Sequence, residues 1–120
     1  MASETPWPIE IRLSADKTTL NVTFESGECL ALAAEYLRVE SPSAEVQGHA
    51  ADQKQIVPGK RQVKIGALEP VGNYAVRIVF DDGHDSGLFS WDYLHDLGRD
   101  HKSRWPAYLK ALKYRRLDRG

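Results

Sequence analysis

The sequence predicts a small α+β domain, and three observations support this fold class. Short runs over the first 90 residues alternate apolar with polar side chains, which is typical of antiparallel strands with one buried face. Turns containing glycine separate several of these runs. The remaining chain carries apolar residues three and four positions apart, as amphipathic helices do. With 120 residues, the chain is expected to form a single domain spanning 1–120.

The first third of the chain predicts a strand-rich antiparallel meander. Apolar residues alternate over 9–13 and 20–24, and a third short strand is expected over 29–32. A helical turn over 33–37 follows, because Ala, Glu and Leu favour helix. Residues 1–7 are interpreted as a flexible arm.

The middle of the chain predicts a long irregular segment and then a strand. Residues 39–59 are rich in Ser, Pro, Ala and Gly, and they include His49, which we interpret as a solvated loop residue. A strand over 61–67 is expected to bury Val63 and Ile65. Residues 70–73 then predict a turn.

The main hairpin lies within residues 73–98. Alternating side chains predict a strand over 74–80, and the Asp82-Gly83 pair suits a two-residue turn. Leu88 and Phe89 continue into the return strand.

Two helices are expected after this hairpin. Ser90 is expected to cap a short helix that ends before Gly98. An amphipathic C-terminal helix is predicted over 103–117, with Ser103 as its cap and Pro106 in its first turn. Its predicted apolar stripe comprises Trp105, Tyr108, Leu109 and Leu112.

Composition limits the possible classes of function. No long apolar run or secretory signal pattern occurs, so a cytoplasmic protein without a membrane span is expected. The single cysteine, Cys29, excludes an internal disulfide and any multi-cysteine metal site. We expect Cys29 to be a small buried apolar residue rather than a nucleophile.

Charge is unevenly distributed along the chain. Residues 99–120 hold eight Lys or Arg against two Asp, a balance of +6, and residues 1–98 carry −7. This split indicates either attraction between the tail and the body or a basic docking face. Nucleic-acid binding is the weaker interpretation, because the aromatic residues of the C-terminal helix fit a packing stripe and its cations fit the solvent side.

The hairpin contains a cluster of candidate ligands. Asp81, Asp82, His84 and Asp85 could bind a metal ion or a polar ligand, and Trp91 is expected nearby at the entry of the following helix. The alternative is that Asp and Gly occur here because turns favour them. The sequence contains no nucleophile motif, phosphate loop or His-x-Asp iron motif, so no catalytic activity is expected.

Three segments carry a family resemblance: EYLRVESPSAEVQGH (35–49), PGKRQVKI (58–65) and the 73–98 stretch with DDGHDSGLFSWDYL. Over roughly 9–97, the sequence resembles the gamma-butyrobetaine hydroxylase-like N-terminal domain family. The resemblance implies a compact, strand-rich α+β domain and, for this chain, the stand-alone bacterial form.

The resemblance also bears on metal binding. In eukaryotic hydroxylases the similar domain precedes a catalytic domain and holds zinc through a Cys-x-Cys-x₂-Cys segment and a distant His. The equivalent positions here are Ser41, Ser43, Val46 and His84. Because Ser and Val cannot replace thiolates, the family's zinc is not expected in this chain. The hydroxylase activity is not expected either, since its catalytic domain is absent from this sequence, and no other cofactor is expected.

Two hypotheses about function follow. The first is a non-catalytic accessory or protein-interaction domain with a protein partner. The alternative is a metal- or small-ligand-binding domain, centred on His84 and its aspartates, that acts in trans with an oxygenase or an iron–sulphur assembly pathway.

Overall fold

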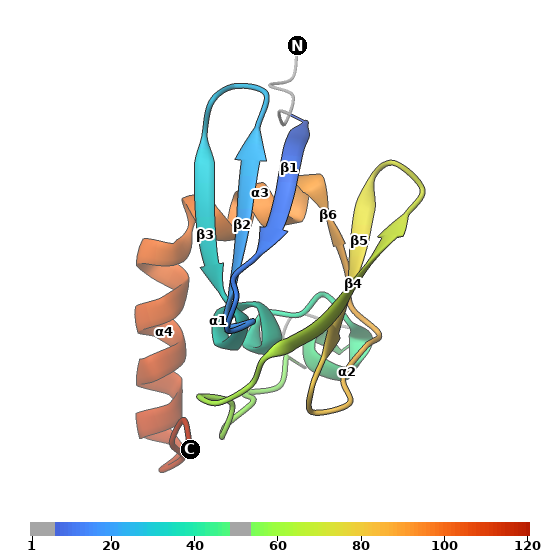
Figure 1. Ribbon diagram of the computed structural model, residues 1–120. Helices are drawn as coiled ribbons and strands as arrows, with labels where there is room; N and C mark the ends of the chain where they lie inside the picture. Colours follow the sequence, from blue (N-terminus) through green and yellow to red (C-terminus); the bar gives the residue numbers. More distant parts are fainter. Residues whose placement is uncertain (1–6, 49–53) are drawn as a thin grey trace.

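The computed structural model describes residues 7–48 and 54–120, and it contains two three-stranded antiparallel sheets. One sheet has the order β1-β2-β3 and the other the order β4-β5-β6 (Figure 1). The strands are β1 (Pro8–Leu13), β2 (Thr19–Phe24), β3 (Cys29–Ala33), β4 (Ile65–Val71), β5 (Ala75–Phe80) and β6 (Leu88–Ser90). The α+β prediction is therefore confirmed.

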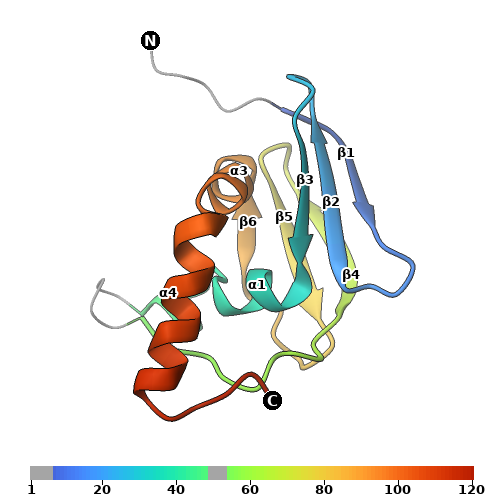
Figure 2. The same ribbon diagram turned by 90° about the vertical axis from the view of Figure 1, so that its left-hand side faces the viewer.

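Four helices complete the described part of the fold. They are α1 (Ala34–Val39), α2 (Ala44–Gln47), α3 (Trp91–Arg99) and α4 (His101–Tyr114). Helix α4 runs along the outside of the molecule, on the side where α1 and α3 lie (Figures 1 and 2). Among the described residues, no helix has the length and apolar character needed to cross a membrane.

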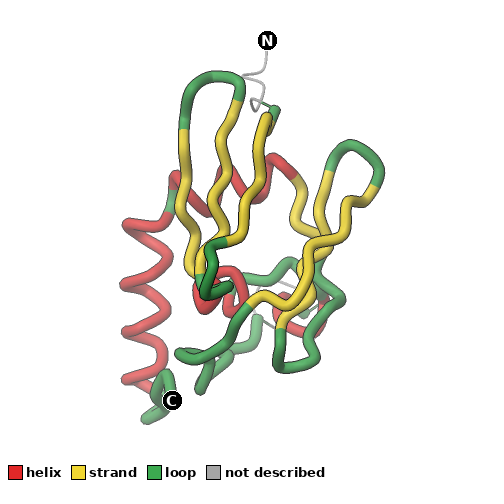
Figure 3. Tube along the Cα trace, viewed as in Figure 1, coloured by secondary structure: helices red, strands yellow, loops and turns green. Residues whose placement is uncertain are grey.

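The main core lies between the two sheets and beside α1 and α3, and Figure 3 shows the arrangement of these helices and strands. Both sheets and both helices contribute large, fully buried side chains to this core, among them Phe24, Tyr36, Phe80, Phe89, Leu94 and Leu97. A smaller cluster joins Val39 of α1 to Tyr108 and Leu112 of α4. The C-terminal helix is thus fastened to the body by its inner face.

Two predictions about the first sheet are wrong. Ile9 is 69% exposed, because the register shifts between Pro8 and Glu10 and the alternation breaks there. Cys29 is exposed rather than buried, because it stands at the turn end of β3. Of the predicted N-terminal arm, residues 1–6 lie outside the described residues, and Trp7 is half exposed.

The segment 39–59 is not irregular throughout. It contains α2, whose N-cap Ser43 accepts a hydrogen bond from the backbone N–H of Glu45. The interpretation of His49 lies outside the described residues. Val63 and Ile65 are buried as expected, but β4 runs over 65–71 instead of 61–67.

The turns and caps also differ in detail. Pro70 lies inside edge strand β4 rather than in a turn. The turn after β5 contains three residues instead of the predicted two, because Phe80 is hydrogen-bonded to His84. Helix α3 continues through Gly98 to Arg99. A Cβ on Gly98 would approach Leu30 to 2.5 Å, so this glycine permits close helix–strand packing instead of ending the helix.

Helix α4 begins at His101, two residues before the predicted cap Ser103, and ends at Tyr114. Pro106 consequently lies inside the helix, beyond its first turn. The predicted stripe is right for Tyr108 and Leu112, which are buried, but Leu109 is 37% exposed. The outer face of α4 is therefore more apolar than expected.

Candidate functional site

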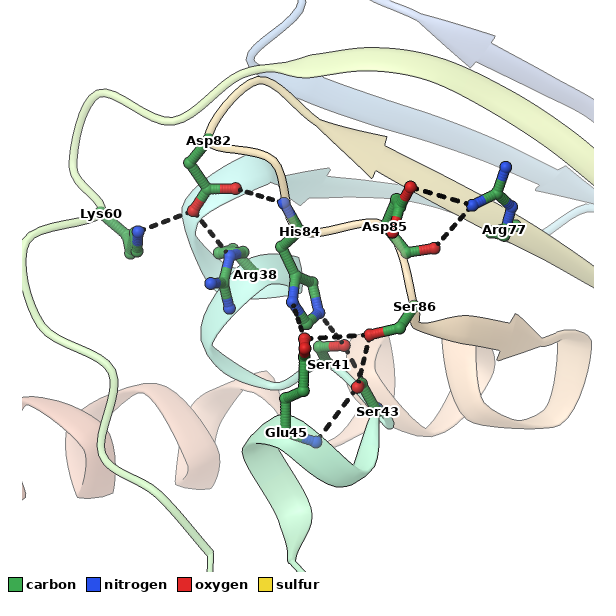
Figure 4. Close-up of polar contacts among 10 residues, drawn as sticks. All are labelled: Arg38, Ser41, Ser43, Glu45, Lys60, Arg77, Asp82, His84, Asp85 and Ser86. Carbon is green, nitrogen blue, oxygen red and sulfur yellow. Dashed lines mark hydrogen bonds and ion pairs between the residues drawn. The ribbon is translucent and has the colours of Figure 1, made fainter.

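The positions that the family resemblance selected meet beneath the loop between β5 and β6. This loop, residues 81–87, packs against the segment that joins α1 to α2 and against α2 itself (Figure 4). The approach is close, since a Cβ on Gly87 would lie 2.4 Å from Ser41 Oγ. Glycine at position 87 therefore allows the loop to reach the helical segment.

His84 points into this contact, and both of its ring nitrogens have partners. Its side chain is 3% exposed, with Nε2 2.9 Å from Ser41 Oγ and Nδ1 2.9 Å from Glu45 Oε1. A carboxylate can only accept, so Nδ1–H donates to Glu45 and Nε2 accepts from the Ser41 hydroxyl. The imidazole thus has no free nitrogen for another ligand.

A second set of hydrogen bonds closes the same contact. Ser43 Oγ accepts from the backbone N–H of Glu45, and its own proton can go to Ser86 Oγ at 2.7 Å. The Ser86 hydroxyl in turn donates to Glu45 Oε1 at 3.0 Å. We call His84, Ser41, Ser43, Glu45 and Ser86 the His84 network. Each polar side chain in it has a partner within the protein.

The electrostatic surroundings favour a neutral imidazole. Burial lowers the pKa of His84 below its ordinary value of 6.5, and the positive charge of Arg38 acts in the same direction. The carboxylates of Glu45 and Asp82 oppose this shift but do not reverse it. Arg38 Nη1 is itself buried without a hydrogen-bond partner among the described residues.

Asp82 belongs to a separate ion-pair cluster beside His84. Its Oδ2 lies 2.9 Å from Arg38 Nε and 2.6 Å from Lys60 Nζ, and its Oδ1 accepts from the backbone N–H of His84. Partial burial acts to raise its pKa, but these hydrogen bonds outweigh it and lower the pKa of Asp82 to about 2. Asp82 therefore holds the loop as a carboxylate.

The structure does not bring the other predicted residues together with His84. Asp81 accepts from the backbone N–H of Lys64. Asp85 pairs with Arg77, away from the imidazole (Figure 4). Trp91 follows β6, whose Ser90 pairs with the first residue of β5, so it lies at the opposite end of the hairpin. Its Nε1 donates to the carbonyl of Asn73.

The residues at the family-equivalent positions around His84 do not suit a zinc ion. The side chains around His84 are serine hydroxyls and the carboxylate of Glu45, all engaged in hydrogen bonds, and Val46 offers no ligand atom. Over residues 7–48 and 54–120, no three His, Cys, Asp or Glu side chains form a group able to hold a metal ion.

A shallow pocket of about 340 Å³ lies elsewhere, on the outer face of the first sheet. None of the predicted site residues lines it. Its lining comprises Glu10, Arg12, Asn21, Val22, Thr23, Cys29, Leu30 and Ala31.

Sequence reasoning missed Glu45, Ser86 and Arg38 as parts of the site. Glu45 follows Ser43 by two positions, and a Ser before a short polar-apolar run is a helix-cap signal that could have located α2. Ser86 and Arg38 carry no such signal, because their roles depend on tertiary contacts 41 and 44 positions away in sequence.

With this geometry described, comparison with known proteins decides the family. The family model described as "Gamma-butyrobetaine hydroxylase-like, N-terminal" matches residues 11–95. The chain belongs to this family. Among curated proteins, no significant match to this family member was found.

Solved structures extend the comparison to the whole domain. Two protein structures determined by NMR in solution are 43% and 41% identical, with TM-scores of 0.84 and 0.82. The matches cover 99% and 97% of this chain and 89% and 91% of the other chains. A crystal structure of a DUF971-family protein of unknown function from Acidithiobacillus ferrooxidans is 37% identical, with a TM-score of 0.67. This match covers 81% of the present chain and 98% of the other chain.

Proposed function

We propose that this domain is a non-catalytic accessory module that binds a protein partner in the bacterial cytoplasm. The family membership supports an accessory role, since the family is described by its position N-terminal in larger hydroxylase-like proteins. The exposed, unpaired thiol of Cys29 is compatible with a reducing compartment.

The observation that carries this proposal is the closed His84 network. A general base or a metal ligand needs a lone pair directed at a substrate or ion. Here Nε2 is engaged by Ser41 and Nδ1 by Glu45, 2.9 Å in each case. These contacts join residues more than 35 positions apart, so the network holds the hairpin loop against α2.

Affinity capture with the full chain as bait tests the proposal. The expected result is a partner that is retained at moderate salt, that captures this chain when used as bait itself, and that an unrelated domain of equal size and charge does not retain. Failure to recover any such partner across low and moderate salt would contradict an interaction role.

A ligand-binding role is the second candidate, and one observation favours it. The lowered pKa of His84 keeps the imidazole neutral, the form that binds metals, so a ligand that displaced the Ser41 hydroxyl would meet a free lone pair on Nε2. In that case the domain would serve an oxygenase or an iron–sulphur assembly pathway in trans. Elemental analysis of protein purified without chelator separates the two: about one metal per chain supports the second candidate, and a trace amount supports the first.

A further inference from the structure

Helix α4 has two chemically different faces. Its inner face packs Tyr108 and Leu112 against α1. Its outer face has no other helix or strand over it in the described structure (Figures 1 and 2). At 100° per residue, Lys102, Lys110 and Lys113 project away from Tyr108 and Leu112, and Leu109 lies at the edge of this outer side.

The cations on this outer side lack ion-pair partners. Arg104 and Arg119, by contrast, turn inward and bind the buried carboxylates of Glu40 and Glu35. Within the described part of the chain, no carboxylate lies within ion-pair distance of five cations on and after the helix. These five are Lys102, Lys110, Lys113, Arg115 and Arg116. Their uncompensated charge favours an anionic occupant.

Apolar side chains accompany these cations. Leu109 is 37% exposed, Tyr114 88% and Leu117 40%. Tyrosine and other large apolar residues at the centre of a charged surface are typical of protein interfaces, where the charges form the rim. The combination distinguishes this face from a merely solvated one.

We propose that the outer face of α4, together with the cations just after it, is the docking surface for an acidic protein segment that also carries apolar side chains. This inference rests on the proposed function and specifies the chemistry of the partner. A protein segment fits better than nucleic acid, because Tyr108 is buried and Trp105 packs against Tyr36, so Tyr114 is the only exposed ring among the Trp and Tyr side chains of α4. A single exposed ring does not provide the row of stacking platforms that successive bases need.

A model ligand tests the surface directly. The probe is a fluorescein-labelled 16-residue peptide of Glu with interspersed Leu, titrated at 50 mM salt and followed by fluorescence anisotropy. Lys110→Gln/Lys113→Gln should weaken binding about fivefold, in line with the loss of two exposed ion pairs. The matched control is Lys17→Gln/Lys64→Gln, which removes two exposed charges from the turn after β1 and the segment before β4 and should leave the affinity unchanged.

A second variant tests the apolar part. Leu109→Ser/Tyr114→Ser keeps the charge and should weaken peptide binding at 300 mM salt as well, where exposed charges are largely screened. Amide shifts of the ¹⁵N-labelled domain on peptide addition should be confined to α4 and residues 115–117.

Several results would overturn the inference. They are absence of peptide binding at millimolar concentration, equal weakening by the control pair, or stronger binding to a single-stranded oligonucleotide or to phosphatidylserine vesicles. A dimer that is detected by sedimentation and abolished by Lys110→Gln/Lys113→Gln would also overturn it, because a second copy of the chain would then occupy this face. If affinity capture still yields a partner that these α4 variants retain in full, the docking surface is wrong while the interaction role stands.

Discussion

The His84 network and the outer face of α4 differ in whether their polar side chains have partners within the protein. In the network, each of the five side chains has a partner within the protein, and His84 is 3% exposed. On the outer face of α4, the cations have no ion pairs among the described residues and lie beside exposed apolar side chains. Internally satisfied groups stabilise a fold, whereas unsatisfied exposed groups remain available to a partner.

The family-equivalent positions contribute to a hydrogen-bonded contact within the fold. Ser41, Ser43 and His84 are gathered as the resemblance implies, and their side chains are engaged by one another, by Glu45 and by Ser86. Changes in the network should therefore alter the stability of the domain. Changes on the outer face of α4 should alter binding and leave stability nearly unchanged.

The largest expected effect separates the two faces of α4. Leu112→Ala removes a buried side chain and should lower the free energy of unfolding by about 2–4 kcal/mol. Leu109→Ala, on the exposed face, should cost less than about 1 kcal/mol. Urea denaturation followed by tryptophan fluorescence measures both. Equal losses would show that the outer face is also part of the core.

Ser41→Ala should have the next largest effect. It leaves the buried Nε2 of His84 without its hydrogen bond and should destabilise the domain by about 1–3 kcal/mol. Ser26→Ala is a matched control, since Ser26 lies in an exposed turn and should cost little. Thermal unfolding monitored by circular dichroism distinguishes them, and no loss for Ser41→Ala would argue against a structural role for the network.

The effect of pH on the stability of the domain should be smaller than these two effects, and its sign follows from the lowered pKa of His84. Because the pKa of His84 is lowered in the folded state, the unfolded chain takes up the proton first, so stability should fall as the pH drops below 6.5. His84→Gln should flatten this part of the profile. Asp82, with a pKa of about 2, should add a further loss between roughly pH 4 and 2. Stability that rises on acidification from pH 7 to 5.5 would contradict the account.

The smallest effect on stability should come from the outer face of α4. Lys110→Gln/Lys113→Gln breaks no ion pair within the described structure and should change the free energy of unfolding by about 0.5 kcal/mol or less. Urea denaturation at matched ionic strength checks this value. A loss above about 1 kcal/mol would mean that these lysines stabilise the fold.

Local sequence signals predicted much of the fold because they depend on neighbouring residues. The alternation in 20–24 and 74–80 identified β2 and β5, and Ser90 caps α3 through Tyr93 N–H as expected. The errors at Ile9 and Gly98 arise from a β-bulge and from close packing on Leu30, and neither is encoded locally.

The candidate site was predictable only in part. The family-equivalent positions led to His84 and its neighbours, whereas the prediction for Cys29 failed because strand alternation does not show which residue ends at a turn. The contacts that Glu45 and Arg38 make depend on how the loop at 81–87 packs against α1 and α2. The spacing of residues in the sequence does not specify this packing.

The most direct test is the protonation state of His84 at pH 7, read from long-range ¹H–¹⁵N NMR spectra of the imidazole with and without 1 mM zinc. The account predicts a neutral ring protonated at Nδ1 and unchanged by the metal. A ring nitrogen that shifts on zinc addition, or a proton on Nε2 in place of Nδ1, would contradict it.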